Sequence, residues 1–269
     1  MNVKGFDHGN RGVGIRDLQL VIPSVVCSTH VAKKIANAVG AVTFEHNTGC
    51  GIIGGDVSGI AQFFGEMANH PNINSVLIVG LGCETIQGNE LADSLLAKNK
   101  STKYLVIQES GGMGQTLSTG SNIASELANA NKGKSVELAK VKIGIDNSAK
   151  SENASKIVEL LEKNGYAIEI QSGPNSGENF TNLMRKGVHL ILSFVAPDQP
   201  VNGYPFIPVI NLASNSPLHQ AIALDFDLSA NASDSEILDL VSRVINGEKS
   251  KAEILNIGEI VAPRLVRSV

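Results

Sequence analysis

The sequence predicts an α/β protein of two domains, each with a mostly parallel sheet flanked by helices, and an active-site cleft between them. Short apolar runs alternate with segments of helical periodicity almost throughout, which favours parallel βαβ units. The 27 glycines imply many tight turns. The apolar pattern lapses at residues 131–134 and then restarts, so we expect domains at residues 1–134 and 135–269.

The first domain contains four predicted strands, each followed by a predicted helix. Apolar runs mark the strands, and apolar residues three or four positions apart mark the helices. We expect Ser28 or Thr29 to cap the first helix. The strands are predicted at residues 18–26, 41–47, 75–82 and 103–108, and the helices at residues 29–37, 57–68, 89–98 and 121–131.

The second domain repeats the alternation. Asn-Gly pairs at 164–165 and 246–247 are typical of residues that end helices. Ser233, followed by acidic residues, is typical of a helix start. The strands are predicted at residues 141–145, 167–170, 188–194 and 208–212, and the helices at residues 154–163, 179–185 and 234–245.

Composition excludes several classes of function. The net charge of -4 and the lack of a Lys/Arg-rich stretch argue against nucleic acid as a partner. The 4% aromatic content without Trp argues against a platform for stacking bases. No apolar run approaches the roughly 20 residues of a membrane helix, and no export signal is recognisable, so we expect a cytoplasmic protein.

The three cysteines, Cys27, Cys50 and Cys83, each follow an apolar, strand-like run. The carboxyl ends of strands in a parallel sheet share one edge, where such folds bind ligands. Any one of the three can instead be a small buried hydrophobe. An odd cysteine count in a chain of this length argues against a disulfide framework. Their common position therefore predicts a site at one edge.

The segment at residues 44–55 is the most unusual in the chain. His46 and Cys50 lie four residues apart in a glycine-rich turn, and imidazole with thiolate is a common ligand pair for zinc or iron. The alternative is that His46 only forms hydrogen bonds within the turn. The glycines also leave backbone N–H groups available for a carboxylate or phosphate.

The segment at residues 79–84 follows a strand and contains part of a dinucleotide-binding fingerprint. Thr85 stands where the third glycine belongs, so the nucleotide signal is weak. The alternative is that Cys83 and Glu84 face the same cleft as the other cysteines, with Glu84 as a metal ligand or general base. A solvated glutamate at a helix start is a further interpretation of Glu84.

Two arginines lie in the glycine-rich segment at residues 7–16. Because these glycines precede a strand, they do not form a phosphate loop between strand and helix. Arg11 and Arg16 are suited to bidentate pairing with a carboxylate substrate. Ordinary salt bridges are the alternative.

Six motifs in order give the first half of the chain a specific likeness. With them the chain resembles the altronate and galactarate dehydratase family, which includes the large subunit of sulfolactate sulfo-lyase. The likeness downstream is thinner, at residues 203–213 and 246–253. The motifs are Arg11-Gly-Val-Gly-Ile-Arg16, Pro23-Ser-Val-Val-Cys-Ser28, His46-Asn-Thr-Gly-Cys-Gly51, His70-Pro-Asn72, Val79-Gly-Leu-Gly-Cys-Glu84 and Gln108-Glu-Ser-Gly-Gly112.

The resemblance implies a lyase that acts on sugar acids with a divalent metal, usually Fe(II), with Mn or Zn as other candidates. A base removes the proton alpha to the carboxylate, the metal stabilises the enediolate, and the beta-hydroxyl or sulfite departs. The implied metal ligands are Cys27, His46, Cys50 and Cys83, and the implied catalytic residues are His46, Cys83 and Glu84. The implied substrate-binding residues are Arg11, Arg16, Gln108, Glu109, Gly111 and Gly112.

The chain departs from the family in two ways. Family members usually have Cys-Gly-Gly-Ser-Asp after the first strand of the second domain, whereas residues 146–150 here read Asp-Asn-Ser-Ala-Lys. If the family's cysteine is needed for metal binding or catalysis, Asp146 would have to serve as an oxygen ligand in its place. The sequence is also shorter than typical large subunits, and no segment of it resembles the family's small amino-terminal domain. We therefore expect a small partner subunit, and also a homo-oligomer.

Two other interpretations stay open. The cysteine count alone is compatible with an iron–sulfur cluster on three thiolates, whose open iron binds the leaving hydroxyl. The missing Cys-Gly-Gly segment favours a divergent binding protein that keeps the anion cleft without turnover.

Overall fold

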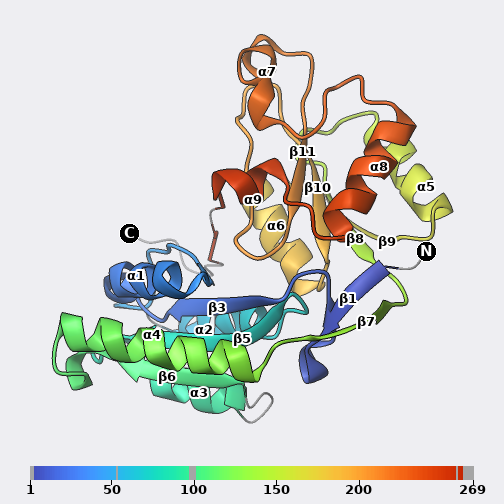
Figure 1. The fold of residues 1–269 in the computed structure, drawn as a ribbon. Coiled ribbons are helices and arrows are strands. Elements are labelled where there is room, and N and C mark those ends of the chain that lie inside the picture. Colours follow the sequence, from blue (N-terminus) through green and yellow to red (C-terminus); the bar gives the residue numbers. More distant parts are fainter. Residues whose placement is uncertain (1–2, 53, 97–100, 259, 263–269) are drawn as a thin grey trace. The chain divides into compact units, whose positions relative to one another are not determined.

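The chain forms two compact units in a computed structural model that describes residues 3–52, 54–96, 101–258 and 260–262. We call residues 6–134 and 260–262 the amino-terminal unit, and residues 3–5 and 135–258 the carboxyl-terminal unit. Each unit is built on a four-stranded parallel sheet flanked by helices (Figure 1). The predicted α/β class is therefore confirmed.

The amino-terminal sheet has the strand order β4-β3-β5-β6, with all neighbours parallel. All eight residues of β5 are buried, as expected for an inner strand covered on both faces. The predicted strand at 41–47 is only two residues long, because the chain turns inward at Phe44, which packs against Phe64. The strands are β3 (Leu18–Pro23), β4 (Val42–Thr43), β5 (Ile73–Gly80) and β6 (Thr102–Val106).

Helices cover both faces of this sheet (Figure 1). On one face α1 (Thr29–Val39) and α4 (Met113–Ala130) pack in one apolar cluster with β3 and β5. On the other face lie α2 (Gly55–Ala68) and α3 (Gly88–Leu96). Helix α4 begins eight residues before its predicted start, since its early glycines weaken the helical signal. Gly120 lets α1 and α4 approach closely, because a Cβ there would lie 2.4 Å from Ile35 Cδ1 on α1 and would displace that side chain.

The carboxyl-terminal sheet has the strand order β11-β10-β8-β9, again all parallel. Helix α6 packs on β8, β9 and β10, and α5 packs against α8. The strands are β8 (Lys142–Asp146), β9 (Ala167–Gln171), β10 (Leu190–Phe194) and β11 (Val209–Leu212). The helices are α5 (Ala154–Lys163), α6 (Ser176–Arg185), α7 (Pro217–Ala221), α8 (Asp234–Ile245) and α9 (Lys251–Leu255).

The helix caps follow the prediction at α8 but not at α1. Ser233 and Glu236 form a reciprocal capping box at the start of α8. At α1 neither Ser28 nor Thr29 caps with its side chain, because the Ser28 hydroxyl donates to the Val25 carbonyl at 2.9 Å. That bond closes a short 3₁₀ turn between β3 and α1.

Several elements were not predicted. A third sheet has the order β2-β1-β7, with strands β1 (Val3–Asp7), β2 (Val13–Gly14) and β7 (Lys134–Leu138). Strand β7 is mostly exposed and therefore lacks an apolar pattern. Helices α7 and α9, of five residues each, are too short to show periodicity. No helix among the described residues is long and apolar enough to cross a membrane.

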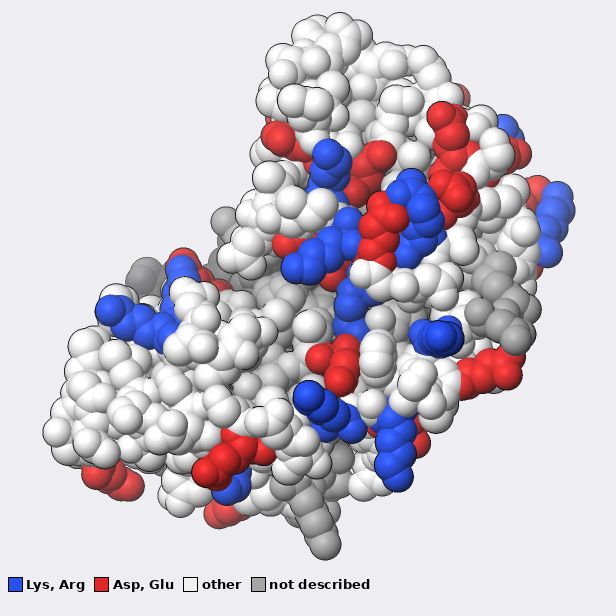
Figure 2. Space-filling view, in the orientation of Figure 1, with Lys and Arg blue, Asp and Glu red and all other residues white. Residues whose placement is uncertain are grey.

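Charge is unevenly distributed over the carboxyl-terminal unit. Over α8 and α9, basic and acidic side chains alternate (Figure 2), and Arg243 of α8 pairs with Asp239 at 2.9 Å and with Glu248. The surface around α7 is white in the same view. Residues 199–224, which include α7, contain no Lys, Arg, Asp or Glu.

Candidate functional site

The loops that follow β3, β4 and β5 are hydrogen-bonded to one another at the carboxyl edge of the amino-terminal sheet. Val26 N–H donates to the Thr48 carbonyl at 2.9 Å, and Thr85 N–H donates to the Gly49 carbonyl at 3.0 Å. Each of the three cysteines lies within two residues of one of these bonds. The structure therefore brings the cysteine-bearing loops together, as parallel strands with a shared edge allow.

All three cysteines, Cys27, Cys50 and Cys83, are free and exposed. This excludes the interpretation that they are small buried hydrophobes. A thiol at the surface is accessible to alkylating reagents and to ligands, whereas a buried one is inert. The edge thus presents three accessible sulfur atoms on neighbouring loops.

Gly49 holds the loop after β4 against the loop after β3. Its φ of 100° lies where glycine is favoured. A Cβ at this position would lie 2.5 Å from the Ser24 carbonyl oxygen and 2.6 Å from Val25 Cα, which are both backbone atoms. Only glycine permits this approach, so the position of Cys50 depends on its neighbour.

Glu84 stabilises the loop after β5 through the hydrogen bonds of its buried carboxylate. Its side chain is 3% exposed, and Oε1 accepts hydrogen bonds from the Ser24 hydroxyl at 2.9 Å and Leu81 N–H at 3.2 Å. Oε2 accepts from Gly82 N–H at 2.6 Å. Because α3 begins only at Gly88, Glu84 is not a solvated helix-start residue. Both carboxylate oxygens are engaged in holding the loop.

The environment of Glu84 stabilises its charged form. Burial acts to raise the pKa of this carboxyl group, but the hydrogen bonds from Gly82, Ser24 and Leu81 outweigh it, so the pKa lies below the ordinary value of 4.5. A general base works best with a pKa near the operating pH. The predicted role of Glu84 as a base therefore gains no support from its surroundings.

His46 is likewise bonded on both sides of its ring. Nε2–H donates to the Pro23 carbonyl at 2.7 Å, so Nδ1 is the acceptor nitrogen. Nδ1 accepts from Thr48 N–H at 3.1 Å and from the Thr48 hydroxyl at 2.8 Å. The ring is 9% exposed and packs edge-on against Phe64. This is the arrangement of the alternative interpretation, in which His46 organises the turn.

We expect His46 to make the fold sensitive to mild acid. Burial lowers the pKa of His46 below 6.5, and the bond to Pro23 only partly opposes this. The unfolded chain therefore binds the proton more readily, and stability present above about pH 6.5 is lost as the pH falls through the lower folded value. Urea unfolding at about pH 7.5 and about pH 5.5 measures the loss.

Two histidine variants test this assignment. In His46→Gln the free energy of unfolding should depend less on pH than in the wild type and should be about 1–3 kcal/mol lower at neutral pH. His30→Gln, on the exposed side of α1, should keep the wild-type pH dependence. An unchanged pH slope in His46→Gln would show that the ring is not the titrating group.

The loop after β6 completes the edge. Gln108 N–H donates to the Leu81 carbonyl at 3.1 Å, and the Gln108 side chain lies over Gly82, where a Cβ would be 2.5 Å from its Oε1. Gln108, Glu109, Gly111 and Gly112 are all exposed. Gly112 precedes α4 and no side chain caps this helix. The first N–H groups of α4 are therefore available to an anion.

The structure does not bring the two arginines to this edge. Arg11 Nε donates to the Ala68 carbonyl at 2.7 Å, where α2 ends, and Nη1 donates to the Asn74 carbonyl near the start of β5. Arg16 Nη1 donates to the Ile15 carbonyl, before β3 begins. Burial lowers the pKa of Arg11 to about 10. Both side chains lie at the amino edge of the sheet, opposite the cysteines.

A shallow cavity of about 500 Å³ adjoins the edge along α1. Its basic groups are His30, Lys33 and Lys34, and Lys33 forms an ion pair with Glu45 in the loop after β4. Val26, next to Cys27, forms part of its wall. Lys33 and Lys34 therefore lie near the loop that carries Cys27.

The predicted ligand set does not fit a metal ion as it is arranged. Among the described residues, no three or more His, Cys, Asp or Glu side chains gather in a way that holds a cation. Both nitrogens of His46 and both oxygens of Glu84 are engaged within the chain. A divalent metal or an iron–sulfur cluster therefore stays a prediction from the resemblance and the cysteine count.

Asp146 is also engaged. It is fully buried at the carboxyl end of β8, in the carboxyl-terminal unit. Oδ1 accepts from the Asn179 amide at 2.7 Å and from Ser148 N–H at 3.1 Å, and Oδ2 accepts from the hydroxyls of Ser193 at 2.8 Å and Ser148 at 3.2 Å. With four donors around it, Asp146 does not replace the family's cysteine as an open ligand.

Two residues that organise the edge were missed from the sequence. Ser24 is fully buried and donates to Glu84, and Thr48 is 1% exposed and donates to His46. A polar residue directly after an apolar strand, as at Ser24, is a signal that sequence reasoning can use. Thr48 follows His46 by two residues, which is the spacing of a local side-chain bond.

The amino-terminal half of the chain is similar to known proteins. Residues 5–132 match the family described as D-galactarate dehydratase/Altronate hydrolase, second domain. Altronate dehydratase of Bacillus subtilis (strain 168) is 29% identical over 157 residues, which are 53% of this chain and 31% of that protein. Altronate dehydratase of Escherichia coli (strain K12) is 31% identical over 96 residues, 32% of this chain and 19% of that protein.

The chain spans less than a third of the length of either relative. A solved structure titled "Structure of probable two-component system response regulator/GGDEF domain protein" covers 90% of this chain and 99% of its own at 10% identity. Its TM-score of 0.30 is too low to indicate a common fold. Residues 5–132, which carry the three cysteine-bearing loops, are thus similar to the second domain of the D-galactarate dehydratase/Altronate hydrolase family.

Proposed function

We propose that this chain is a dehydratase-type lyase that acts on a sugar acid or a related hydroxy- or sulfo-carboxylic acid in the cytoplasm. The observation that carries the proposal is the set of hydrogen-bonded loops at the carboxyl edge of the amino-terminal sheet, within the part of the chain that matches the family. The names of the two relatives support the substrate class. Free, exposed cysteines suit a reducing compartment.

The reaction is a beta-elimination. The C–H bond alpha to the carboxylate breaks and its proton passes to a base, while the electron pair forms a double bond to the beta carbon. The beta C–O bond breaks, and the hydroxyl group leaves with a proton as water. The enol that remains tautomerises to a 2-keto acid, so atoms and electrons balance without an oxidant.

The edge offers groups for binding and for proton transfer. The uncapped start of α4 and the N–H groups of Gly111 and Gly112 suit the substrate carboxylate. Gln108 lies over the neighbouring loop and is placed to hold a hydroxyl group. Among the exposed groups, Cys83 and Glu109 are the candidates for the base. His46 and Glu84 act as positioning residues that hold the loops.

Protection of the thiols from alkylation tests binding without requiring turnover. We expect altronate or galactarate at saturating concentration to slow iodoacetamide labelling of Cys50 and Cys83 at least about threefold, because a bound ligand covers exposed sulfur. Peptide-level mass spectrometry separates the three sites. Labelling rates that no sugar acid changes would contradict the assignment of the edge as the binding site.

Formation of 2-keto acid in the same samples tests the chemistry. Protection together with product supports the dehydratase proposal, and Glu109→Gln and Cys83→Ser then distinguish the two candidate bases by a loss of about 10²–10⁴ in kcat. Protection without product supports binding without turnover. That second candidate is favoured by the engaged state of His46 and Glu84, whose polar atoms all serve the fold.

A further inference from the structure

A cavity of about 470 Å³ opens at the carboxyl edge of the carboxyl-terminal sheet. This edge, outside the ends of parallel strands, is where open α/β sheets bind ligands. Its volume is within the range of small-molecule pockets. The residues that line it include Ser176, Ser193, Gln199, Val201, Asn202 and Ile257.

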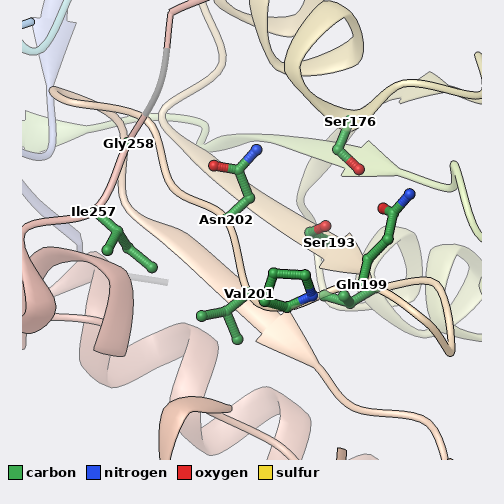
Figure 3. Close-up of a pocket in the computed structure, with 9 residues that line it drawn as sticks. Ser176, Ser193, Gln199, Val201, Asn202, Ile257 and Gly258 are labelled. Carbon is green, nitrogen blue, oxygen red and sulfur yellow. The ribbon is translucent and has the colours of Figure 1, made fainter. Parts of the chain in front are cut away.

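The polar groups of the cavity lie together on one side. Figure 3 shows Ser193 at the end of its strand, with the amides of Gln199 and Asn202 extending toward the side on which Ser176 lies. The side chains of Val201 and Ile257 lie on the opposite side in this view. The cavity therefore has a polar wall and an apolar wall.

Asp146 determines how two serine hydroxyls face the cavity. A carboxylate only accepts hydrogen bonds, so the hydrogen of Ser193 is directed to Asp146 at 2.8 Å. The hydrogen of Ser148 is also directed to Asp146, and Ser176 in turn donates to Ser148 at 2.8 Å. Both cavity serines therefore present oxygen lone pairs, which accept hydrogen bonds from a ligand.

Asn202 supplies a hydrogen-bond donor, in contrast to the two serines, which supply acceptors. Its Oδ1 accepts from Gly203 N–H at 2.8 Å, which leaves the side-chain NH₂ as the group for a ligand. Gly203 also keeps this wall in place, because a Cβ there would lie 2.2 Å from the Ile257 carbonyl oxygen. The cavity therefore combines acceptors and a donor in a fixed arrangement, as a ligand with several hydroxyl groups requires.

The charge around the cavity selects against an anion. None of the described residues that line it is charged, and the Asp146 carboxylate lies directly behind Ser193. A ligand carboxylate would meet serine lone pairs and a buried negative charge, and no Lys or Arg among the described lining residues would offset them. We propose that this cavity binds a small uncharged polyol, separately from the sugar-acid site at the edge of the amino-terminal sheet.

A matched pair of ligands tests the proposal. Galactitol and galactarate share a carbon chain and differ in the groups at its two ends, CH₂OH in one and carboxylate in the other. We expect galactitol to shift the amide NMR signals of Ser176, Asn202 and Gly203 with a Kd of about 1–10 mM, as suits so small a ligand. Galactarate should bind at these residues at least about tenfold more weakly.

Three variants locate the binding. Ser176→Ala removes one acceptor and should weaken galactitol binding about fivefold. Val201→Phe fills the cavity and should weaken it more than about tenfold. Ser172→Ala, at an exposed position outside the cavity wall, should leave the Kd unchanged. Because these signals belong to the carboxyl-terminal unit, they report independently of thiol protection at the other sheet.

Three outcomes would overturn the polyol site. The first is tighter binding of galactarate than of galactitol at Ser176 and Asn202. The second is the absence of any shift at galactitol concentrations tenfold above the expected Kd. If galactitol shifts signals only outside the lining residues, the cavity is likewise not its site.

Discussion

Replacing Glu84 is expected to cost about 2–4 kcal/mol of unfolding free energy, because Glu84→Ala removes the acceptor for the partly buried Leu81 and Gly82 N–H groups and for the buried Ser24 hydroxyl. Glu84→Gln should cost about 1–3 kcal/mol. An amide has one oxygen, so in either orientation its NH₂ group faces a backbone N–H. Urea unfolding at neutral pH measures both losses.

The pH dependence of the free energy of unfolding distinguishes the contribution of the Glu84 charge from that of the size and shape of its side chain. Since the folded pKa is depressed, the stabilisation is complete above the ordinary value of 4.5 and is lost as the pH falls through the lower folded value. The difference between wild type and Glu84→Gln should therefore shrink in acid. The exposed Glu126 on α4 is the matched control, and Glu126→Ala should change stability by less than about 0.5 kcal/mol. Equal effects at both positions would contradict the anchoring role of Glu84.

Gly49→Ala is expected to destabilise the chain by about 3–5 kcal/mol and to detach the Cys50 loop. Its Cβ would meet the backbone of Ser24 and Val25 at 2.5 and 2.6 Å, which side-chain repacking does not relieve. The φ of 100° adds strain for any residue other than glycine. Urea unfolding gives the energy, and faster alkylation of Cys50 reports the freed loop.

Gly51, in the same loop, is the control. Its φ of 66° is also positive, but a Cβ there would meet no atom within 4 Å beyond its chain neighbours, so Gly51→Ala should cost only about 1 kcal/mol. If Gly49→Ala and Gly51→Ala behave alike, backbone conformation rather than close packing explains the effect. In that case the contact between the two loops is not what holds Cys50.

Much of the fold could be predicted from the sequence where apolar periodicity and cap signals agree. Helices α5 and α8 begin and end at the predicted residues. Strand β7 was missed because its exposed residues carry no apolar pattern, and the strand at 41–47 was overestimated because an apolar residue can be buried without pairing in a sheet. Periodicity reports burial, and burial alone does not specify a strand.

The site was less predictable than the fold. Each cysteine follows an apolar run that predicts a strand. Because parallel strands end at the same edge of a sheet, the loops that carry the cysteines lie next to one another. Arg11 and Arg16 precede the first parallel strand, so they lie at the amino edge instead. The sequence also did not predict that His46 and Glu84 use all their polar atoms inside the fold. Their hydrogen bonds depend on backbone groups whose positions are set only by the folded loops.

Intramolecular cross-linking of the thiols tests most directly that the distant loops form one site. Neighbouring Cα atoms are about 3.8 Å apart, and Cys50 and Cys83 each lie within two residues of the Thr85–Gly49 bond. A short bismaleimide with a reach of about 10 Å should therefore join Cys50 to Cys83 within one chain, and Gly49→Ala should reduce the yield. Complete single-thiol labelling of both cysteines, without any cross-linked peptide from monomeric protein, would contradict the account.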